Sequence, residues 1–264
     1  MSIPCLGRVH DRRAVAWESS GVSERRRLPR RYLVVAAFVF VVAASERFGG
    51  PLTVDALRGA VSSGTEAAAD QLRDRNARGE IHLTFDDGPT PGYTAEILEL
   101  LDRYDAEAVF FPIGEQVEPN AALLERAVDD GHRLGNHTWA HDRLADLTAW
   151  DFDAAVGRTQ IAVERATGTV PTCLRPPEGV IDDAAVDMAA AEGLTVEMWT
   201  VDPLDWQTDD PDAIARRVID GAEDGAVVLL HDGGGGRDAT VDALGTILRE
   251  LGRDGYRFTV LPGC

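Results

Sequence analysis

Short apolar segments alternate with amphipathic helical patterns throughout residues 79–264, and this alternation limits the fold more than any other feature of the chain. Apolar side chains recur at helical spacing between the segments, as at Ile97, Leu98 and Leu101. Repeated strand–helix units build a parallel sheet with helices outside it, and this many units favour closure into a barrel. We therefore predict an α/β fold close to a (β/α) barrel.

Glycine and proline residues mark where the predicted elements end. A first strand carries Ile81, Leu83 and Phe85 and stops before a Gly-Pro turn. The further strands are expected at 108–111, 173–175, 196–201, 226–230 and 256–261. Besides the helix that begins after Pro91, helices are expected at 121–130, 149–167, 182–192, 211–222 and 240–251.

The first 78 residues differ in composition from the rest and divide into three parts. Residues 1–31 form a basic leader with eight arginines and three acidic residues, 32–45 are almost wholly apolar, and 46–78 resemble a linker. A basic flank before a short apolar core is typical of a secretory signal. The core is shorter than the ~20 residues of a comfortable membrane span.

Three interpretations of residues 32–45 remain open: a signal peptide cleaved near Ala44 or Ser45, an uncleaved signal anchor that holds the chain in the membrane, and a buried core helix. The first two place the domain at 79–264 outside the cytoplasm, secreted or anchored, because the arginine cluster stays inside.

The chain is strongly acidic, with 45 acidic and 26 basic residues, a net charge of −19 and no lysine. This charge argues against nucleic acid and against anionic polymers as partners at low salt. It indicates an acidic surface of the kind that keeps proteins soluble in concentrated salt. The three cysteines, Cys5, Cys173 and Cys264, match no metal motif. Cys173 and Cys264 could pair outside the cell, but we favour free, buried thiols.

Two adjacent carboxylates, Asp86 and Asp87, stand at the end of the first predicted strand. Alone, such a pair is more typical of a turn or a helix cap than of a site. About fifty residues later His137 and His141 are spaced i and i+4, which places both on one face of a helical turn. One aspartate and two histidines form a zinc-type site with an open position for water.

Further polar residues follow other predicted strands: Arg175, Asp202, Asp205 and His231. In barrels of strand–helix units the working residues lie at the carboxyl ends of the strands. The sequence therefore predicts one site to which several strand ends contribute.

Five motifs occur in a fixed order: Thr84-Phe85-Asp86-Asp87-Gly88-Pro89, His137-Thr138-Trp139-Ala140-His141, Arg175-Pro176-Pro177-Glu178-Gly179, Asp202-Pro203-Leu204-Asp205-Trp206 and Leu229-Leu230-His231-Asp232. On these motifs residues 80–262 resemble the polysaccharide deacetylases of the NodB-homology type, carbohydrate esterase family 4. The resemblance implies an incomplete or distorted (β/α) barrel and a deacetylase catalytic domain at 79–264. It also implies metal-dependent removal of acetyl groups from N-acetylglucosamine-type glycans.

The resemblance assigns a role to each motif. Asp87, His137 and His141 would bind a divalent metal, with zinc as the preferred ion. Asp86 would be the general base, paired with Arg175. His231 would be the general acid, its pKa raised by Asp205. The small apolar pocket for the acetyl methyl group would be lined by Trp206 and Leu229.

Glu178 departs from the family pattern, which usually has an aromatic residue at this position. A backbone N–H near Glu178 would still serve the oxyanion by analogy. The carboxylate itself would stand at the cleft, so the sequence predicts poor tolerance of anionic glycans.

Several alternatives stay open. The chain could be an O-acetyl-xylan esterase or another carbon–nitrogen hydrolase of the same fold, or a non-catalytic glycan-binding member. Asp202 is expected to cap the turn before Pro203, and His82 and His132 to be structural. Asp232 either orients His231 or starts the glycine run. Residues 233–236 are expected to form a flexible surface loop, because no lysine follows them as in a phosphate-binding loop.

Overall fold

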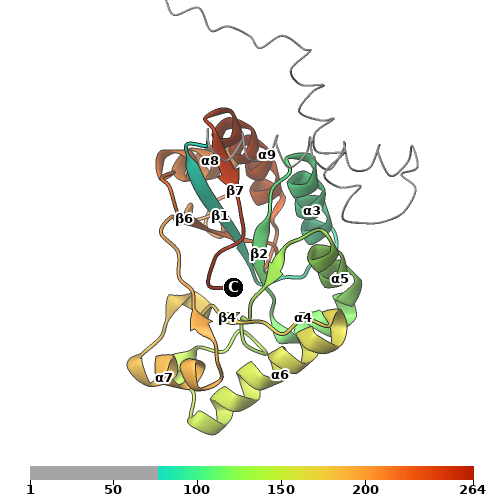
Figure 1. Cartoon of the computed structure of the whole chain (residues 1–264), viewed down its shortest axis with the longest axis vertical. Coiled ribbons are helices and arrows are strands. Elements are labelled where there is room, and N and C mark those ends of the chain that lie inside the picture. Colours follow the sequence, from blue (N-terminus) through green and yellow to red (C-terminus); the bar gives the residue numbers. More distant parts are fainter. Residues whose placement is uncertain (1–76) are drawn as a thin grey trace, which may run out of the picture. The chain divides into compact units, whose positions relative to one another are not determined.

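The structure is a computed structural model, and it describes residues 77–264 (Figure 1). The basic leader, the signal or anchor segment at 32–45 and residues 46–76 of the predicted linker lie outside the described residues. Within 77–264, no helix combines the length and the hydropathy needed to cross a membrane.

The centre of the fold is a parallel sheet built around β1 (Gly79–Asp86). On one side β1 pairs with β6 (Ala226–His231), and on the other with β2 (Ala108–Phe111), next to which lies β3 (Arg133–Leu134). The start of β1 also pairs with β7 (Tyr256–Phe258). Figure 1 shows β1 between β6 and β2.

A second, two-stranded sheet of β4 (Cys173–Leu174) and β5 (Thr195–Val196) continues the ring of strands. Single parallel bridges connect Asn136 with Leu174 and Val201 with Val228. All the ladders are parallel, but only isolated bridges connect the two sheets, so the barrel is not closed. The α/β prediction is confirmed, as a distorted and incomplete barrel.

Helices connect the strands and cover the sheet. They are α3 (Tyr93–Arg103), α4 (Gly114–Val117), α5 (Ala121–Asp129), α6 (Ala149–Thr167), α7 (Asp183–Ala191), α8 (Pro211–Asp220) and α9 (Asp238–Arg253). Their ends follow local signals. Thr148 caps α6 at its start, and Gly168 ends it with a positive φ of 71°. Asp182 and Asp210 cap α7 and α8 through their side chains.

The alternation of side chains along β1 separates the core from the site. Ile81, Leu83 and Phe85 are fully buried in the main hydrophobic cluster, where Phe85 stacks on Phe110 with ring centroids 5.1 Å apart. Thr84 and Asp86 alternate with them and bind the guanidinium of Arg175. One strand therefore presents an apolar face to the core and a polar face to the site.

The strand predicted at 196–201 is mostly wrong. Only Thr195–Val196 pairs as a strand, and Val201 makes a single bridge to Val228. Between them, the carbonyl groups of Glu197 and Met198 accept hydrogen bonds from the Arg175 side chain. These carbonyls serve a buried cation, so they do not continue a ladder. Strand β7 is likewise shorter than predicted and ends at Phe258.

The helical turn predicted for His137 and His141 is also wrong. The segment is a turn in which Thr138 and His141 have positive φ angles of 64° and 60°. Side chains stabilise it, because Asn136 Oδ1 accepts from the Thr138 amide and Thr138 Oγ1 accepts from the Asp142 amide. The two histidines are brought together by this turn and not by helical periodicity.

Cys173 and Cys264 form a disulfide with their Cα atoms 5.0 Å apart, so our preference for free thiols is wrong. The last residues pack back onto β4. Leu261 is buried in the same cluster as Cys173, and Thr172 Oγ1 donates to the carbonyl oxygen of Cys264 at 2.9 Å. These contacts bring two thiols that are 91 residues apart in sequence within bonding reach.

Candidate active site

A cavity of about 860 Å³ opens at the carboxyl ends of β1 and β6. Its lining includes six of the seven side chains predicted to act in catalysis or metal binding: Asp86, Asp87, His137, His141, Asp205 and His231. Asp86 and His231 are the last residues of their strands and are paired across the ladder. The sheet register therefore places a carboxylate and an imidazole side by side at one edge.

Asp86 is bound by a buried arginine, Arg175, whose three side-chain nitrogens all donate hydrogen bonds. The Arg175 side chain is fully buried, and its Nη1 donates to Asp86 Oδ1 at 3.0 Å and to Thr84 Oγ1. Its Nε and Nη2 donate to the carbonyls of Glu197 and Met198, each at 3.2 Å, and its guanidinium lies over the Phe111 ring. With each of its three nitrogens bound, Arg175 fixes the orientation of the carboxylate.

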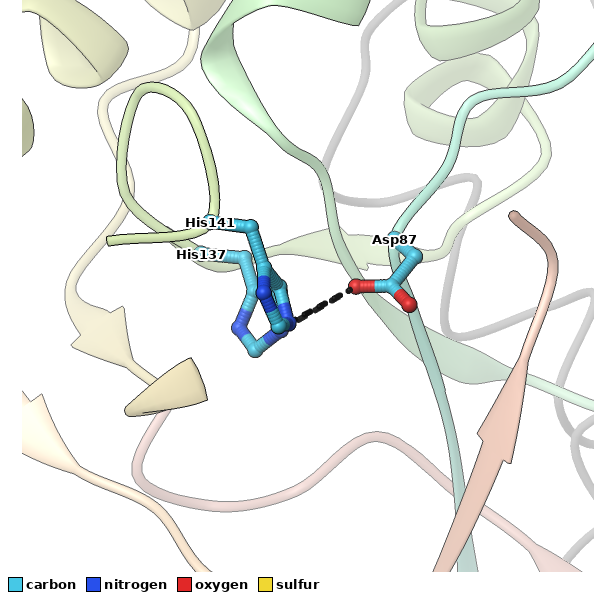
Figure 2. Close-up of side chains that lie close together, drawn as sticks. All are labelled: Asp87, His137 and His141. Atoms are coloured by element: carbon cyan, nitrogen blue, oxygen red, sulfur yellow. Dashed lines mark ion pairs between the residues drawn. The ribbon is translucent and has the colours of Figure 1, made fainter. Parts of the chain in front are cut away.

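Asp87, His137 and His141 converge on one point (Figure 2). Oδ1 of Asp87 lies 3.4 Å from Nε2 of each histidine. The positive φ of Asp87, 73°, breaks the alternation of β1 and lets a second carboxylate reach the same cavity. Nδ1 of His137 lies 2.8 Å from the carbonyl oxygen of Arg175, so its Nε2 faces Asp87.

These three residues fit a metal ion. Oδ1 of Asp87 is buried and has no hydrogen-bond partner, although two imidazole nitrogens lie close to it. Separations of 3.4 Å are long for hydrogen bonds. They match the ~3.3 Å between neighbouring donors of a tetrahedral ion with bonds of about 2.0–2.1 Å. The set of one oxygen and two nitrogen donors also suits a divalent ion.

The electrostatics keep Asp87 ionised. Burial raises the pKa of its carboxyl, but the interaction with His137 and the nearby His231 and His141 outweigh burial and lower the pKa below its usual value. An ionised carboxylate is the form that binds a metal.

His231, next to Asp86 in the strand register, forms a pair with Asp205. Its Nδ1 lies 2.7 Å from Asp205 Oδ1, while Oδ2 accepts from the His231 amide and from Thr240 Oγ1. Burial lowers the pKa of His231, but Asp205 raises it, assisted by Asp86 and Asp87, and the net shift is upward. The imidazole therefore holds a proton to a higher pH than a free histidine does.

The residues predicted for the acetyl pocket lie on the cavity wall but differ in exposure. Leu229 is buried, whereas Trp206 is 52% exposed at the rim. Sequence reasoning missed Trp199, which also lines the cavity. Its ring packs on Gly179, where an added Cβ would lie 2.8 Å from Cη2. The available signal was an aromatic residue three positions before Asp202. Trp199 falls inside the strand expected at 196–201.

Glu178 lies at the rim with a positive φ of 56°. Its Oε2 forms an ion pair with Arg143 Nε at 3.3 Å. The charge that was expected to face the cleft alone therefore has a cationic partner.

Positive φ angles concentrate at this site. Among residues 77–264, six residues other than glycine have them: Asp87, Asp105, Thr138, His141, Glu178 and Leu204. All but Asp105 belong to the five sequence motifs, and three of them line the cavity. Such conformations cost about 1–3 kcal/mol each and persist where the surroundings enforce them. The backbone is held in unfavourable conformations where the functional side chains meet.

The remaining polar residues divide as follows. Asp202 Oδ1 caps a turn by accepting from the Leu204 amide, and it also lines the cavity. His132 accepts from the Ala108 amide, and His82 Nδ1 lies 3.1 Å from the carbonyl oxygen of Thr259. These two histidines are away from the cavity, as the structural interpretation expects.

Asp232 supports the turn after β1. It accepts a hydrogen bond from Thr94 Oγ1 at 2.6 Å, and a Cβ added to Gly88 would lie 2.1 Å from its Oδ2. Burial raises its pKa to about 7. The glycine run is more than a surface loop, because Gly234, Gly235 and Gly236 form part of the cavity wall.

Comparison with known proteins gives consistent matches. The family model described as polysaccharide deacetylase matches residues 73–197. A peptidoglycan-N-acetylglucosamine deacetylase of Bacillus cereus is 39% identical over 183 residues, which cover 69% of this chain and 85% of that protein. The peptidoglycan-N-acetylglucosamine deacetylase PgdA of Listeria monocytogenes is 36% identical over 181 residues, but the matched part spans only 38% of its length.

Among solved structures, the peptidoglycan deacetylase PdaC of Bacillus subtilis superposes with a TM-score of 0.65. Its sequence is 34% identical, and the match covers 70% of this chain and 88% of that one. The matched share of this chain corresponds in size to the part that the structure describes.

Proposed function

This chain belongs to the polysaccharide deacetylase family, and from that premise we propose that it hydrolyses the acetamide of N-acetylglucosamine-type glycans in a metal-dependent reaction. The observation that supports this most is the set of groups around one cavity. A carboxylate held by arginine, the Asp-His-His group and an imidazole paired with a carboxylate all belong to this one site.

Asp87, His137 and His141 would hold the ion, and we propose zinc because the donors are one carboxylate and two imidazoles. A bound divalent ion supplies Lewis acidity, which polarises the acetyl carbonyl and makes water a better nucleophile near neutral pH.

Asp86 is the proposed general base. Its Oδ1 accepts a hydrogen bond from Arg175. Its Oδ2 lies 3.9 Å from Nε2 of His137, one of the proposed metal ligands. A water molecule beside that group would give its proton to Asp86 as it attacks the acetyl carbon. Arg175 keeps the carboxylate oriented for this transfer.

His231 is the proposed general acid. Breaking the C–N bond releases an amine, which leaves readily only when its nitrogen is protonated. The raised pKa of His231 keeps a proton available near neutral pH, and Asp205 fixes Nδ1 so that Nε2 is the nitrogen that can donate. We also propose that a backbone N–H near Glu178 stabilises the oxyanion, and that Leu229, Trp206 and Trp199 contact the acetyl group and sugar.

We propose an extracytoplasmic location for the catalytic domain at 79–264, delivered by a cleaved signal or a signal anchor at 32–45 that follows the basic leader. The Cys173–Cys264 disulfide supports this location, because disulfides persist in oxidising compartments. The substrate named for the Bacillus cereus relative, peptidoglycan, is a cell-wall glycan.

Acetate release tests the proposal. Chitin oligomers, peptidoglycan and acetyl-xylan are each incubated with the enzyme, with and without a chelator. We expect acetate from the N-acetylated substrates, loss of activity with chelator, and recovery with zinc. Asp86→Asn should abolish release, whereas Asp129→Asn, an exposed carboxylate on α5, should not. Release from acetyl-xylan alone would favour the esterase, and no release at all would favour a glycan-binding protein.

A further inference from the structure

The glycine run ends in a cation that the proposed mechanism does not use. Arg237 follows Gly236 and is the only arginine among the described residues that line the cavity. Six carboxylate residues line the same cavity: Asp86, Asp87, Glu178, Asp202, Asp205 and Asp209. A single guanidinium in an acidic cavity is expected to pair with one of them.

Arg237 makes no such pair. The residue is 7% exposed, and its Nε donates to the carbonyl oxygen of Gly233 at 2.7 Å. Within 77–264 no carboxylate oxygen lies within 4.0 Å of its side-chain nitrogens, although ion pairs hold Asp86, Asp205 and Glu178. The Nε bond fixes the plane of the guanidinium, and the two Nη groups are left for a group in the cavity.

The guanidinium of Arg237 lies beside Asp87, one of the three proposed metal ligands. A Cβ added to Gly234 would be 3.4 Å from Arg237 Nη2 and 2.5 Å from Asp87 Oδ2, so both atoms flank the same glycine. Gly234 also has a positive φ of 70°. The absence of a side chain there lets the cation come close to the group that would hold the metal. An acetamide bound at the metal would therefore place its neighbouring substituents near Arg237.

We propose that Arg237 recognises a carboxylate carried by the glycan close to the scissile acetamide, and so directs the enzyme to acidic N-acetylated glycans. This inference rests on the proposed function and deepens it. In peptidoglycan every second sugar carries a lactyl group on O3, next to the acetamide at C2, and its carboxylate is free where no stem peptide is attached. Chitin has no such group. A planar guanidinium binds a carboxylate through two parallel hydrogen bonds, which are strong where little water reaches them.

The ion pair of Glu178 revises the expectation that the enzyme tolerates anionic glycans poorly. That carboxylate was expected to repel anionic glycans, but Arg143 holds it in an ion pair at the rim. Asp86 and Asp205 are likewise paired. Three of the six acids that line the cavity are therefore paired, and Arg237 is not.

A matched pair of substrates tests the inference. One is a muramyl-containing tetrasaccharide with its free carboxylate, and the other is the same compound with that carboxylate converted to a neutral amide. We expect the parent to favour the carboxylate form in kcat/KM by about 10- to 100-fold, the range for a hydrogen-bonded charged pair. Arg237→Gln should reduce this ratio to near one, and Arg237→Lys should keep part of it.

Arg249→Gln is the matched control, because it removes the same charge from an exposed position on α9, the helix that follows Arg237. Its substrate ratio should equal that of the parent. An equal preference of the parent for both substrates, or a preference for the amide, would overturn the inference even if Arg237→Gln did not fold. A ratio that Arg237→Gln leaves unchanged would also overturn it.

Binding separates this inference from the proposed function. On the Asp86→Asn background, calorimetry should show about tenfold tighter binding of the carboxylate form than of the amide. If no substrate releases acetate but this difference is found, deacetylation is wrong and carboxylate recognition stands. If acetate is released but the two forms bind equally, the proposed function stands and the role of Arg237 is wrong.

Discussion

The backbone carbonyl oxygen of Arg175 lies 2.8 Å from Nδ1 of His137. The side chain of the same arginine binds Asp86. One residue at the end of β4 therefore orients a proposed metal ligand through its main chain and the proposed base through its side chain.

Replacement of Arg175 should separate these two roles. Arg175→Lys keeps the carbonyl but cannot reproduce the donors to Asp86, Glu197 and Met198. We expect kcat to fall at least about 100-fold, the scale of general base catalysis. Stability should fall by about 1–3 kcal/mol, because buried carbonyl groups lose their donors while the positive charge is kept. Metal affinity should change less than tenfold, and a loss as large as that of His137→Ala would contradict the separation. Kinetics, urea unfolding and metal titration provide the three measurements.

The pH profile should report the pair of His231 and Asp205. A general acid acts in its protonated form, so activity is lost as the pH rises through its pKa. Asp205 raises that pKa, and Asp205→Asn should therefore move the basic limb of kcat/KM to lower pH by about one unit or more. The limb is measured between pH 5 and 10. If the basic limb of Asp205→Asn lies at the same pH as that of the parent, a group other than His231 controls it.

His132 should make the protein less stable in acid. Burial lowers its pKa to about 4, against 6.5 in the unfolded chain, so between these values the unfolded chain binds more protons. Stability should fall as the pH drops from about 7 to 4, by up to about 3 kcal/mol. Asp232, with its pKa raised to about 7, gives the opposite slope.

The comparison with His132→Asn isolates the histidine contribution, because asparagine can still accept from the Ala108 amide. Urea unfolding at a series of pH values should show a shallower acid loss for the variant. Parallel curves for parent and variant would refute the assignment.

Reduction of the disulfide should destabilise the fold. The bond closes a long loop, for which the expected contribution is about 2–5 kcal/mol. Dithiothreitol should therefore lower the urea midpoint of the parent. The double variant Cys173→Ala, Cys264→Ala should have the lower midpoint without reductant and not respond to it. A reductant-insensitive parent would argue against the bond.

Salt should stabilise the protein if its acidic composition is an adaptation to concentrated salt. With a net charge of −19, self-repulsion weakens as ions screen it. We expect the melting temperature to rise by at least about 5 °C between 0.05 and 2 M potassium chloride, and most of the rise to occur at low concentrations. Full stability in dilute buffer would remove this interpretation.

Local patterns predicted much of this molecule. The alternation of Ile81, Leu83 and Phe85 identified β1, and the Asp-Asp pair at its end marked the site. The carboxyl end of α6 followed from Gly168. Such features depend on periodicity and backbone chemistry within a few residues, which a sequence displays directly.

What the sequence did not reveal depends on tertiary contacts. The carbonyls of Glu197 and Met198 leave the ladder because a guanidinium from another strand needs them. The turn between His137 and His141 depends on two positive φ angles, which residue spacing does not encode. No local pattern predicts a role for Arg237, because only the folded chain brings it close to Asp87.

The proposed metal ligands come from the end of β1 and one turn, whereas part of the cavity wall is built by separate loop residues at 206–209 and 234–236. Mutational libraries confined to those loops could thus evolve new glycan selectivity while the hydrolytic machinery is inherited intact. Cassette exchange with relatives would be a practical route to tailored enzymes for cell-wall engineering.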